Sequence, residues 1–209
     1  MLGIALLFVG IVLVHNGVLF MSTSKIIKKE SDGKEIELTV PLVVASPKTI
    51  AFFNVVVGSL LVLANFLLLA HHAPLDLIAS GLPRYVIFQN IAAGFVFGFT
   101  YLFIAGNLLL KLDSRPFGLF CFGASIFAFV MVIYNFVQLA DFGMENGYSF
   151  LILALLWITW FVLWFAGVMQ FTFKMKIMEK VFPYISISVG IVGAFIPAIA
   201  LLTGVWGLL

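Results

Sequence analysis

The sequence has few charged residues and a single cysteine, and these shortages exclude several classes of protein. Asp, Glu, Lys and Arg make up 10% of the 209 residues, whereas a soluble globular domain carries about 25%. The lone Cys121 excludes an intrachain disulfide and a cysteine metal cluster. Three histidines (His15, His71 and His72) are too few and too scattered to indicate a metal site. No paired carboxylates, serine-histidine-acid set or phosphate-binding glycine loop is present, so we expect neither an enzyme nor a cofactor.

Apolar residues are abundant and gather in six long stretches. They make up 64% of the chain, and a membrane-spanning helix needs roughly 20 apolar residues. Such windows occupy residues 2–20, 49–70, 85–110, 117–139, 149–172 and 182–207. None contains Asp, Glu, Lys or Arg. The N-terminus lacks a basic segment and a small-residue cleavage site, which favours a retained span over a signal peptide. The sequence predicts an all-α integral membrane protein, with residues 1–209 forming one domain of six transmembrane helices.

Positive charge is confined to alternate loops and predicts the orientation. The first, third and fifth loops between spans hold ten of the eleven basic residues, namely Lys25, Lys28, Lys29, Lys34, Lys48, Lys111, Arg115, Lys174, Lys176 and Lys180. Cytoplasmic loops carry the excess of Lys and Arg in membrane proteins. We therefore expect a multi-pass protein of the bacterial cytoplasmic membrane, with both termini on the outer, periplasmic side. Basic residues at span edges and a net charge of +2 do not indicate nucleic-acid binding.

The first inter-span loop is the longest polar segment. Residues 25–40 alternate in polarity around Asp32-Gly33, and Asp-Gly between alternating flanks is a hairpin signal. The sequence indicates a small cytoplasmic β-hairpin, with a solvated loop as the alternative.

Aromatic residues recur at helical spacing within the spans. Trp157, Trp160 and Trp164 lie within about 60° of one another on a helix. Their buried N–H groups need acceptors, which a narrow wet path or a packed aromatic seam would supply. Phe97 and Tyr101 share one face of the third span, and the Tyr101 hydroxyl could bond a passing amide or a neighbouring backbone carbonyl. The first span carries an aliphatic ridge, which on spacing alone indicates helix packing or lipid contact; it consists of Leu6, Val9 and Leu13.

Several amide side chains and small residues also lie in the spans. Amides join helices in lipid at about 0.6 to 2 kcal/mol each, so we expect a mostly structural role for residues such as Asn16, Asn54 and Asn135. Glycines such as Gly98 allow close helix approach. Pro197 in the sixth span predicts a kink.

Motifs in five places along the chain resemble one known family, and they occur in its order. They are Met1-Leu2-Gly3-Ile4-Ala5-Leu6-Leu7-Phe8-Val9-Gly10-Ile11-Val12-Leu13 with Asn16-Gly17, Phe97-Gly98-Phe99-Thr100-Tyr101-Leu102 with Asn107, Leu112-Asp113-x-Arg115-Pro116, Trp157-x-x-Trp160-x-x-x-Trp164, and Ile196-Pro197-Ala198. The sequence thereby resembles the AmiS/UreI family of bacterial urea and short-chain amide channels.

This resemblance implies six helices per protomer, built as three helical hairpins around a pore inside the protomer. It also implies a homohexameric ring, with lipid filling its centre. The residues that it places along or at constrictions of the pore are Leu6, Val9, Leu13, Phe97, Tyr101, Trp157, Trp160, Leu163 and Trp164.

The sequence departs from the acid-gated members of that family in three ways. Val189 stands where such a channel has a glutamate before the glycine of the sixth span, which leaves urea versus aliphatic amide open. The outer loops contain only two histidines, His71 and His72, as candidate pH sensors. We favour exposed histidines without a role, although the imidazole titrates near pH 6.5. The first loop is also longer than the family leads us to expect.

Spans without ionisable carboxylates or amines are poorly suited to proton or cation coupling. The sequence therefore predicts a passive channel for urea or small neutral amides, which would supply a cytoplasmic urease or amidase. The alternative is a membrane scaffold or sensor that docks such an enzyme through the hairpin of the first loop. An ion-coupled transporter is the least favoured reading.

Overall fold

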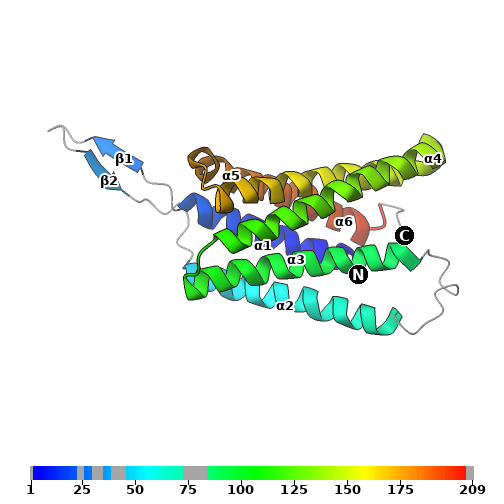
Figure 1. Cartoon of the computed structure of the whole chain (residues 1–209), viewed down its shortest axis with the longest axis horizontal. Coiled ribbons are helices and arrows are strands. Elements are labelled where there is room, and N and C mark those ends of the chain that lie inside the picture. Colours follow the sequence, from blue (N-terminus) through cyan, green and yellow to red (C-terminus); the bar gives the residue numbers. More distant parts are fainter. Residues whose placement is uncertain (1, 23–25, 30–34, 39–45, 73–83, 206–209) are drawn as a thin grey trace.

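The computed structural model describes residues 2–22, 26–29, 35–38, 46–72 and 84–205. Its elements are α1 (Leu2–Ser22), β1 (Ile26–Lys29), β2 (Glu35–Leu38), α2 (Pro47–His72), α3 (Arg84–Leu110), α4 (Arg115–Gly167), the π-helix η2 (Val168–Thr172), α5 (Lys176–Gly190), the π-helix η3 (Ile191–Phe195) and α6 (Ile196–Leu202) (Figure 1). Six helical segments are long and apolar enough to cross a membrane: Gly3–Met21, Pro47–His71, Phe88–Leu110, Arg115–Asp141, Tyr148–Thr172 and Lys176–Leu202. The six predicted spans are confirmed.

The helical elements and the membrane spans do not correspond one to one. α4 contains two spans, because the backbone leaves helical geometry at Gly143, where φ is 70° and ψ is 171°. A positive φ is readily adopted by glycine, which has no Cβ. The sixth span is divided among α5, η3 and α6. The π-helical turn of η3 ends at Phe195, two residues before Pro197, whose ring nitrogen has no hydrogen to donate. The span therefore departs from regular α-helical geometry next to the proline at which the sequence predicted a kink.

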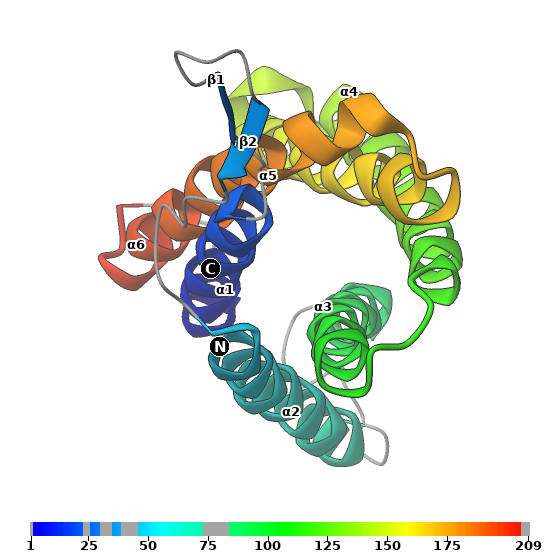
Figure 2. The same ribbon diagram turned by 90° about the vertical axis from the view of Figure 1, so that its left-hand side faces the viewer.

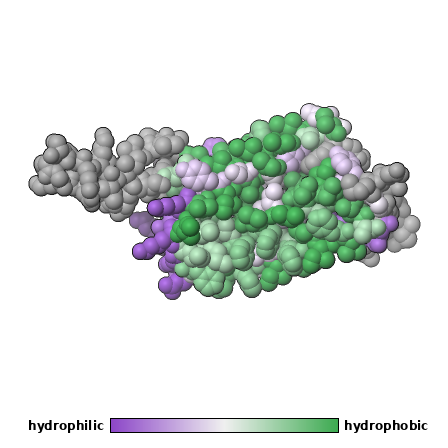
Figure 3. All heavy atoms as spheres, turned by 90° about the horizontal axis from the view of Figure 1, so that it is seen from above, coloured by the Kyte–Doolittle hydropathy of each residue, from purple (hydrophilic) through white to green (hydrophobic). Residues whose placement is uncertain are grey.

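The helices stand side by side around a ring, with α1 and α3 facing its interior (Figure 2). The hairpin of β1 and β2 projects from one end of the bundle (Figure 1). The strands pair antiparallel with Ile26 opposite Leu38 and Lys29 opposite Glu35; the turn between them lies outside the described residues. Hydrophilic residues gather at this end, and an apolar belt covers the middle of the molecule (Figure 3). We call this end, which carries Lys48, Lys111, Arg115, Lys174, Lys176 and Lys180, the lysine-rich end.

Three hairpins joined by the inner loops would pair the first span with the second, the third with the fourth and the fifth with the sixth, but the two most extensive contacts are between other helices. α2 packs most extensively against α3, and α1 against α5. Glycine explains both pairs, because it lets two backbones approach closely. A Cβ built on Gly58 would lie 2.9 Å from the Gly98 carbonyl oxygen, and one on Gly10 would lie 2.9 Å from the Gly190 carbonyl oxygen. The α2–α3 pair is joined by the outer loop between residues 72 and 84, and the α1–α5 pair brings together helices far apart in the chain.

A reciprocal pair of buried amides joins α1 to α2. Asn16 Nδ2 donates to Asn54 Oδ1 at 3.0 Å, and Asn54 Nδ2 donates to Asn16 Oδ1 at 2.7 Å. Asn54 Nδ2 also donates to the Ile50 carbonyl at 2.8 Å. Asn135 instead donates to the Met131 carbonyl of its own helix, at 2.7 Å. The expected joining of helices by amides is thus seen for the first pair.

Candidate functional site

The nine predicted pore residues come together inside the ring. Seven of them are buried in one apolar core: Leu6, Val9, Leu13, Tyr101, Trp160, Leu163 and Trp164. Phe97 and Trp157 are partly buried and pack against that core. The aliphatic ridge of α1 is therefore turned inward and does not face lipid.

Phe97, Trp160 and Trp164, which we call the tryptophan cluster, fill the middle of this interior. The Phe97 ring centroid lies 4.4 Å from that of Trp160 and 5.1 Å from that of Trp164, and the two indoles are 5.9 Å apart. Trp164 is 2% exposed. Such contacts correspond to the tilted and edge-to-face arrangements that aromatic rings prefer. In this conformation the tryptophans form a packed aromatic seam.

Trp164, Thr100 and Tyr101 form hydrogen bonds within the protein. Trp164 Nε1 donates to Thr100 Oγ1 at 3.3 Å, and Thr100 Oγ1 donates to the Val96 carbonyl at 2.7 Å. The Tyr101 hydroxyl donates to the Val9 carbonyl at 3.4 Å. Of the two partners that the sequence left open for Tyr101, the structure shows the backbone carbonyl. The 3.4 Å distance is long for an O–H···O bond, so this hydroxyl is weakly held.

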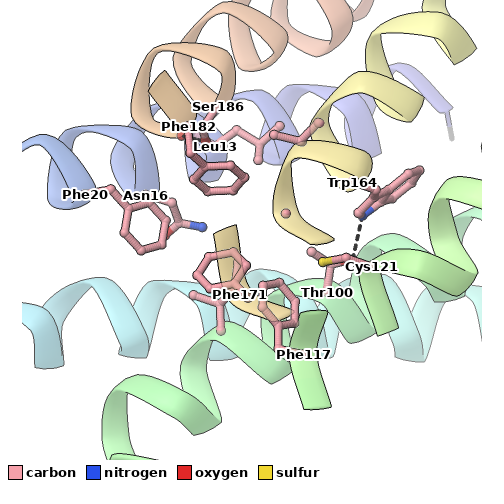
Figure 4. A pocket seen from close by; sticks show the side chains of 13 residues that line it. Leu13, Asn16, Phe20, Thr100, Phe117, Cys121, Trp164, Phe171, Phe182 and Ser186 are labelled. Carbon is pink, nitrogen blue, oxygen red and sulfur yellow. Dashed lines mark hydrogen bonds between the residues drawn. The ribbon is translucent and has the colours of Figure 1, made fainter. Parts of the chain in front are cut away.

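A cavity of about 30 Å³ lies next to the tryptophan cluster. Its walls come from α1, α3, both halves of α4, η2 and α5, and consist of Leu13, Asn16, Phe20, Thr100, Ile104, Phe117, Cys121, Leu163, Trp164, Gly167, Phe171, Phe182 and Ser186 (Figure 4). A buried water occupies roughly 10–15 Å³ by this measure. The cavity therefore has the volume of about two water molecules.

A second set of rings, Phe20, Phe117, Phe171 and Phe182, lines this cavity; we call it the phenylalanine cluster. Phe171 lies 5.0 Å from Phe117, 6.1 Å from Phe20 and 5.2 Å from Phe182 between ring centroids. Phe20 is near the end of α1 and Phe117 near the start of α4, and both of these helix ends lie at the lysine-rich end (Figure 1). The phenylalanine cluster thus lies between the tryptophan cluster and that end of the bundle.

Of the residues that line the cavity, the sequence predicted only Leu13, Leu163 and Trp164 as pore residues. Some of the missed positions continue the predicted stripes, whereas Phe117, Cys121, Phe182 and Ser186 come from the fourth and sixth spans, where no stripe was predicted. Leu6, Val9 and Leu13 are followed at spacings of three and four by Asn16 and Phe20. Extending each stripe by two turns would have found these residues.

Val189 and His71 are positions at which the sequence departs from the acid-gated members of the family. Val189 is buried in the same core as the tryptophan cluster, so an apolar side chain occupies this interior position. His71 is exposed at the last turn of α2, remote in sequence from every residue of the cavity wall. The side chain of His72 lies outside the described residues. No group of three or more His, Cys, Asp and Glu that could hold a metal ion occurs among the residues that the structure describes.

These features define a multi-pass membrane protein of six apolar helices whose interior holds clusters of aromatic rings and a small cavity without charged side chains in its wall. The chain matches the description "AmiS/UreI family transporter" over residues 38–205 and belongs to that family.

Known proteins resemble this chain over nearly its whole length. The acid-activated urea channel of Helicobacter pylori is 28% identical, with 99% of this chain and 100% of that protein covered. A Mycolicibacterium smegmatis protein, named provisionally as an amidate substrates transporter, is 25% identical over 98% of this chain and 78% of its own length. The electron cryomicroscopy structure of the H. pylori urea channel in its closed state superposes with a TM-score of 0.73, at 28% identity, covering 99% of this chain and 100% of that one.

Proposed function

We propose that this protein is a passive channel for urea or small neutral amides across the bacterial cytoplasmic membrane. The observation that carries the proposal is the neutrality of the interior. No Asp, Glu, Lys, Arg or His is buried among the described residues. The buried asparagines, serines and threonine offer only neutral amides and hydroxyls: Asn16, Asn54, Asn65, Thr100, Ser125, Asn135 and Ser186. A neutral solute needs hydrogen-bond partners and close walls, whereas ion coupling needs ionisable groups. The names of the two relatives support urea and amides as the solute class.

The proposed path runs past the nine predicted residues and then through the cavity. Solutes would pass in single file between flat aromatic faces, which favour thin, planar molecules. Ions would be excluded because a narrow apolar constriction cannot replace their hydration. The cavity has the volume of about two water molecules. A larger solute can therefore pass only if neighbouring side chains move. The described conformation is accordingly a closed or narrow one.

The wider arrangement is part of the same proposal. Residues 1–209 would form one channel domain, and six protomers would form a ring whose centre is filled by lipid. The lysine-rich end would face the cytoplasm, because cytoplasmic loops carry the excess of basic residues. Both termini would then lie on the outer side. A cytoplasmic urease or amidase would consume the solute.

Flux measurements in liposomes test the pore assignment. Wild-type protein should carry urea or acetamide above the background of empty liposomes, and Trp160→Ala and Trp164→Ala should lower the ratio of urea to water permeability. Phe165→Ala is the matched control, because Phe165 follows Trp164 in the sequence but is 42% exposed at the surface of the helix bundle. An unchanged ratio in both tryptophan variants would show that the path lies elsewhere.

A further inference from the structure

We infer that Asn16 and Ser186 together form a recognition site for the amide group of the solute, in the cavity beside the tryptophan cluster. Asn16 donates a hydrogen bond to the carbonyl oxygen of the solute, and Ser186 accepts one from its N–H. The inference rests on the proposed function and names the residues that would choose amides over other small neutral molecules.

Asn16 faces the cavity as a hydrogen-bond donor. It is 1% exposed and lines the cavity. Its oxygen accepts from Asn54, and one of its two N–H groups donates to Asn54. The second N–H has no partner among the described residues, and Figure 4 shows the nitrogen of Asn16 directed into the space between the labelled phenylalanines.

Asn54 fixes this orientation of the Asn16 amide. Both N–H groups of Asn54 are used, one on Asn16 Oδ1 and one on the Ile50 carbonyl. Rotating the Asn54 amide so that its nitrogen and oxygen exchange places would put its oxygen next to the Ile50 carbonyl oxygen. Asn54 must therefore present its nitrogen to Asn16 Oδ1 and its oxygen to Asn16 Nδ2. Because the pair is locked, the unpaired N–H of Asn16 is held ready for an acceptor.

Ser186 faces the same cavity as a hydrogen-bond acceptor. It is 1% exposed. It belongs to α5 and lines the cavity together with residues of α3 and α4. Its hydroxyl donates to the Leu13 carbonyl at 2.9 Å. With its only hydrogen used, the oxygen retains lone pairs that can accept. Leu13 precedes Asn16 by three residues, so these two residues lie on the same face of α1. Ser186 therefore bonds to α1 on the face that carries Asn16.

The remaining polar groups of the wall are already engaged. Thr100 Oγ1 donates to Val96 and accepts from Trp164, whose single N–H is thereby used. The unpaired N–H of Asn16 and the lone pairs of Ser186 thus face a cavity whose wall is otherwise made largely of apolar and aromatic side chains. This combination matches a carbonyl oxygen and an N–H on the same small planar molecule. It does not match an ion.

Two variant pairs test the inference in the full-length protein reconstituted into liposomes. Ser186→Ala should lower the ratio of urea to water permeability about two- to tenfold, which is the effect of one hydrogen bond. Ser125→Ala, the control, removes an equally buried hydroxyl that donates to the Phe122 carbonyl at 2.7 Å and does not line the cavity. It should leave the ratio unchanged.

Thiourea tests the donor. It keeps the N–H groups of urea but offers sulfur, a weak acceptor, in place of oxygen. The wild-type protein should therefore prefer urea over thiourea, Asn16→Leu should abolish that preference, and Asn135→Leu should retain it.

Equal ratios in Ser186→Ala and Ser125→Ala, or a retained preference for urea in Asn16→Leu, would overturn the inference while leaving the channel intact. Absence of urea and acetamide flux in the wild type would overturn the proposed function as well. If Asn16→Leu does not fold, the serine pair decides alone, because Ser186→Ala removes only one oxygen atom.

Discussion

Replacing Gly10 by alanine should destabilise the protein, although alanine is the better helix former. A Cβ at this position would lie 2.9 Å from the Gly190 carbonyl oxygen, 3.0 Å from the Phe195 backbone nitrogen and 3.1 Å from the Phe195 Cβ. Ordinary contacts between such atoms need about 3.5–4.0 Å. The nearest two atoms belong to the backbones of α5 and η3, so they cannot move aside by changing a rotamer. α1 must shift away from the sixth span.

The magnitude follows from two opposing effects. Overpacking costs about 1–3 kcal/mol, and the change from glycine to alanine returns up to about 1 kcal/mol of helix propensity. Because the clash is with backbone atoms, we expect a cost in the upper part of that range, about 2–3 kcal/mol, and hence a net loss of about 1–2 kcal/mol. For a chain of this size the midpoint of thermal unfolding changes by about 2–4 °C per kcal/mol. We therefore expect a decrease of roughly 2–8 °C for Gly10→Ala, measured on detergent-solubilised protein by loss of the monodisperse peak after heating.

The chain offers a graded set of controls. At Gly3 the nearest atoms are the Leu202 Cγ at 3.1 Å and the Leu201 Cβ at 3.2 Å. They are side-chain atoms at slightly longer distances than the backbone atoms near Gly10, so Gly3→Ala should cost less. Gly123→Ala would meet nothing within 4 Å and should be neutral or stabilising. The order of stability should be Gly123→Ala, Gly3→Ala, Gly10→Ala. A Gly10→Ala variant as stable as Gly123→Ala would refute the close backbone contact between α1 and the sixth span.

Three further changes have defined expected outcomes. Asn54→Leu should lower stability by about 1–4 kcal/mol, because two buried amide bonds are lost and Asn16 is left unpaired; Asn135→Leu, which loses one bond within its own helix, should cost less in the same thermal assay. Urea flux should change by less than about tenfold between about pH 7.5 and pH 5, and a larger increase that disappears in the double variant His71→Ala and His72→Ala would identify these histidines as sensors. Deleting residues 25–40 should leave urea flux per reconstituted protein unchanged, and a loss of flux would make this segment part of the channel; co-purification of a urease or amidase that is lost on deletion would identify it as a docking site.

The number and chemistry of the helices follow from local sequence. Hydropathy over about 20 residues is a sum over neighbours in the chain, so the windows at 49–70 and 149–172 correspond closely to the spans Pro47–His71 and Tyr148–Thr172. The tryptophan spacing likewise puts Trp160 and Trp164 on one face whatever the surroundings. These properties need no knowledge of the partner helices.

Contacts between helices depend on tertiary structure. The hydroxyl of Ser186 and the carbonyl of Leu13 are 173 residues apart in the chain, and nothing in either local sequence identifies the other. The same holds for Asn16 with Asn54, and for Gly10 with Gly190.

The sequence by itself determined that six uncharged helices cross a membrane and that basic loops gather at one end. It also determined which face of the first, third and fifth spans carries the aromatic or aliphatic stripe. Only the tertiary structure decided that α1 packs on α5 and α2 on α3, and that Asn16 and Ser186 line the same cavity. The reason is that hydropathy and helical periodicity are set within one segment, whereas close packing depends on the shapes of two segments that meet only in the folded protein.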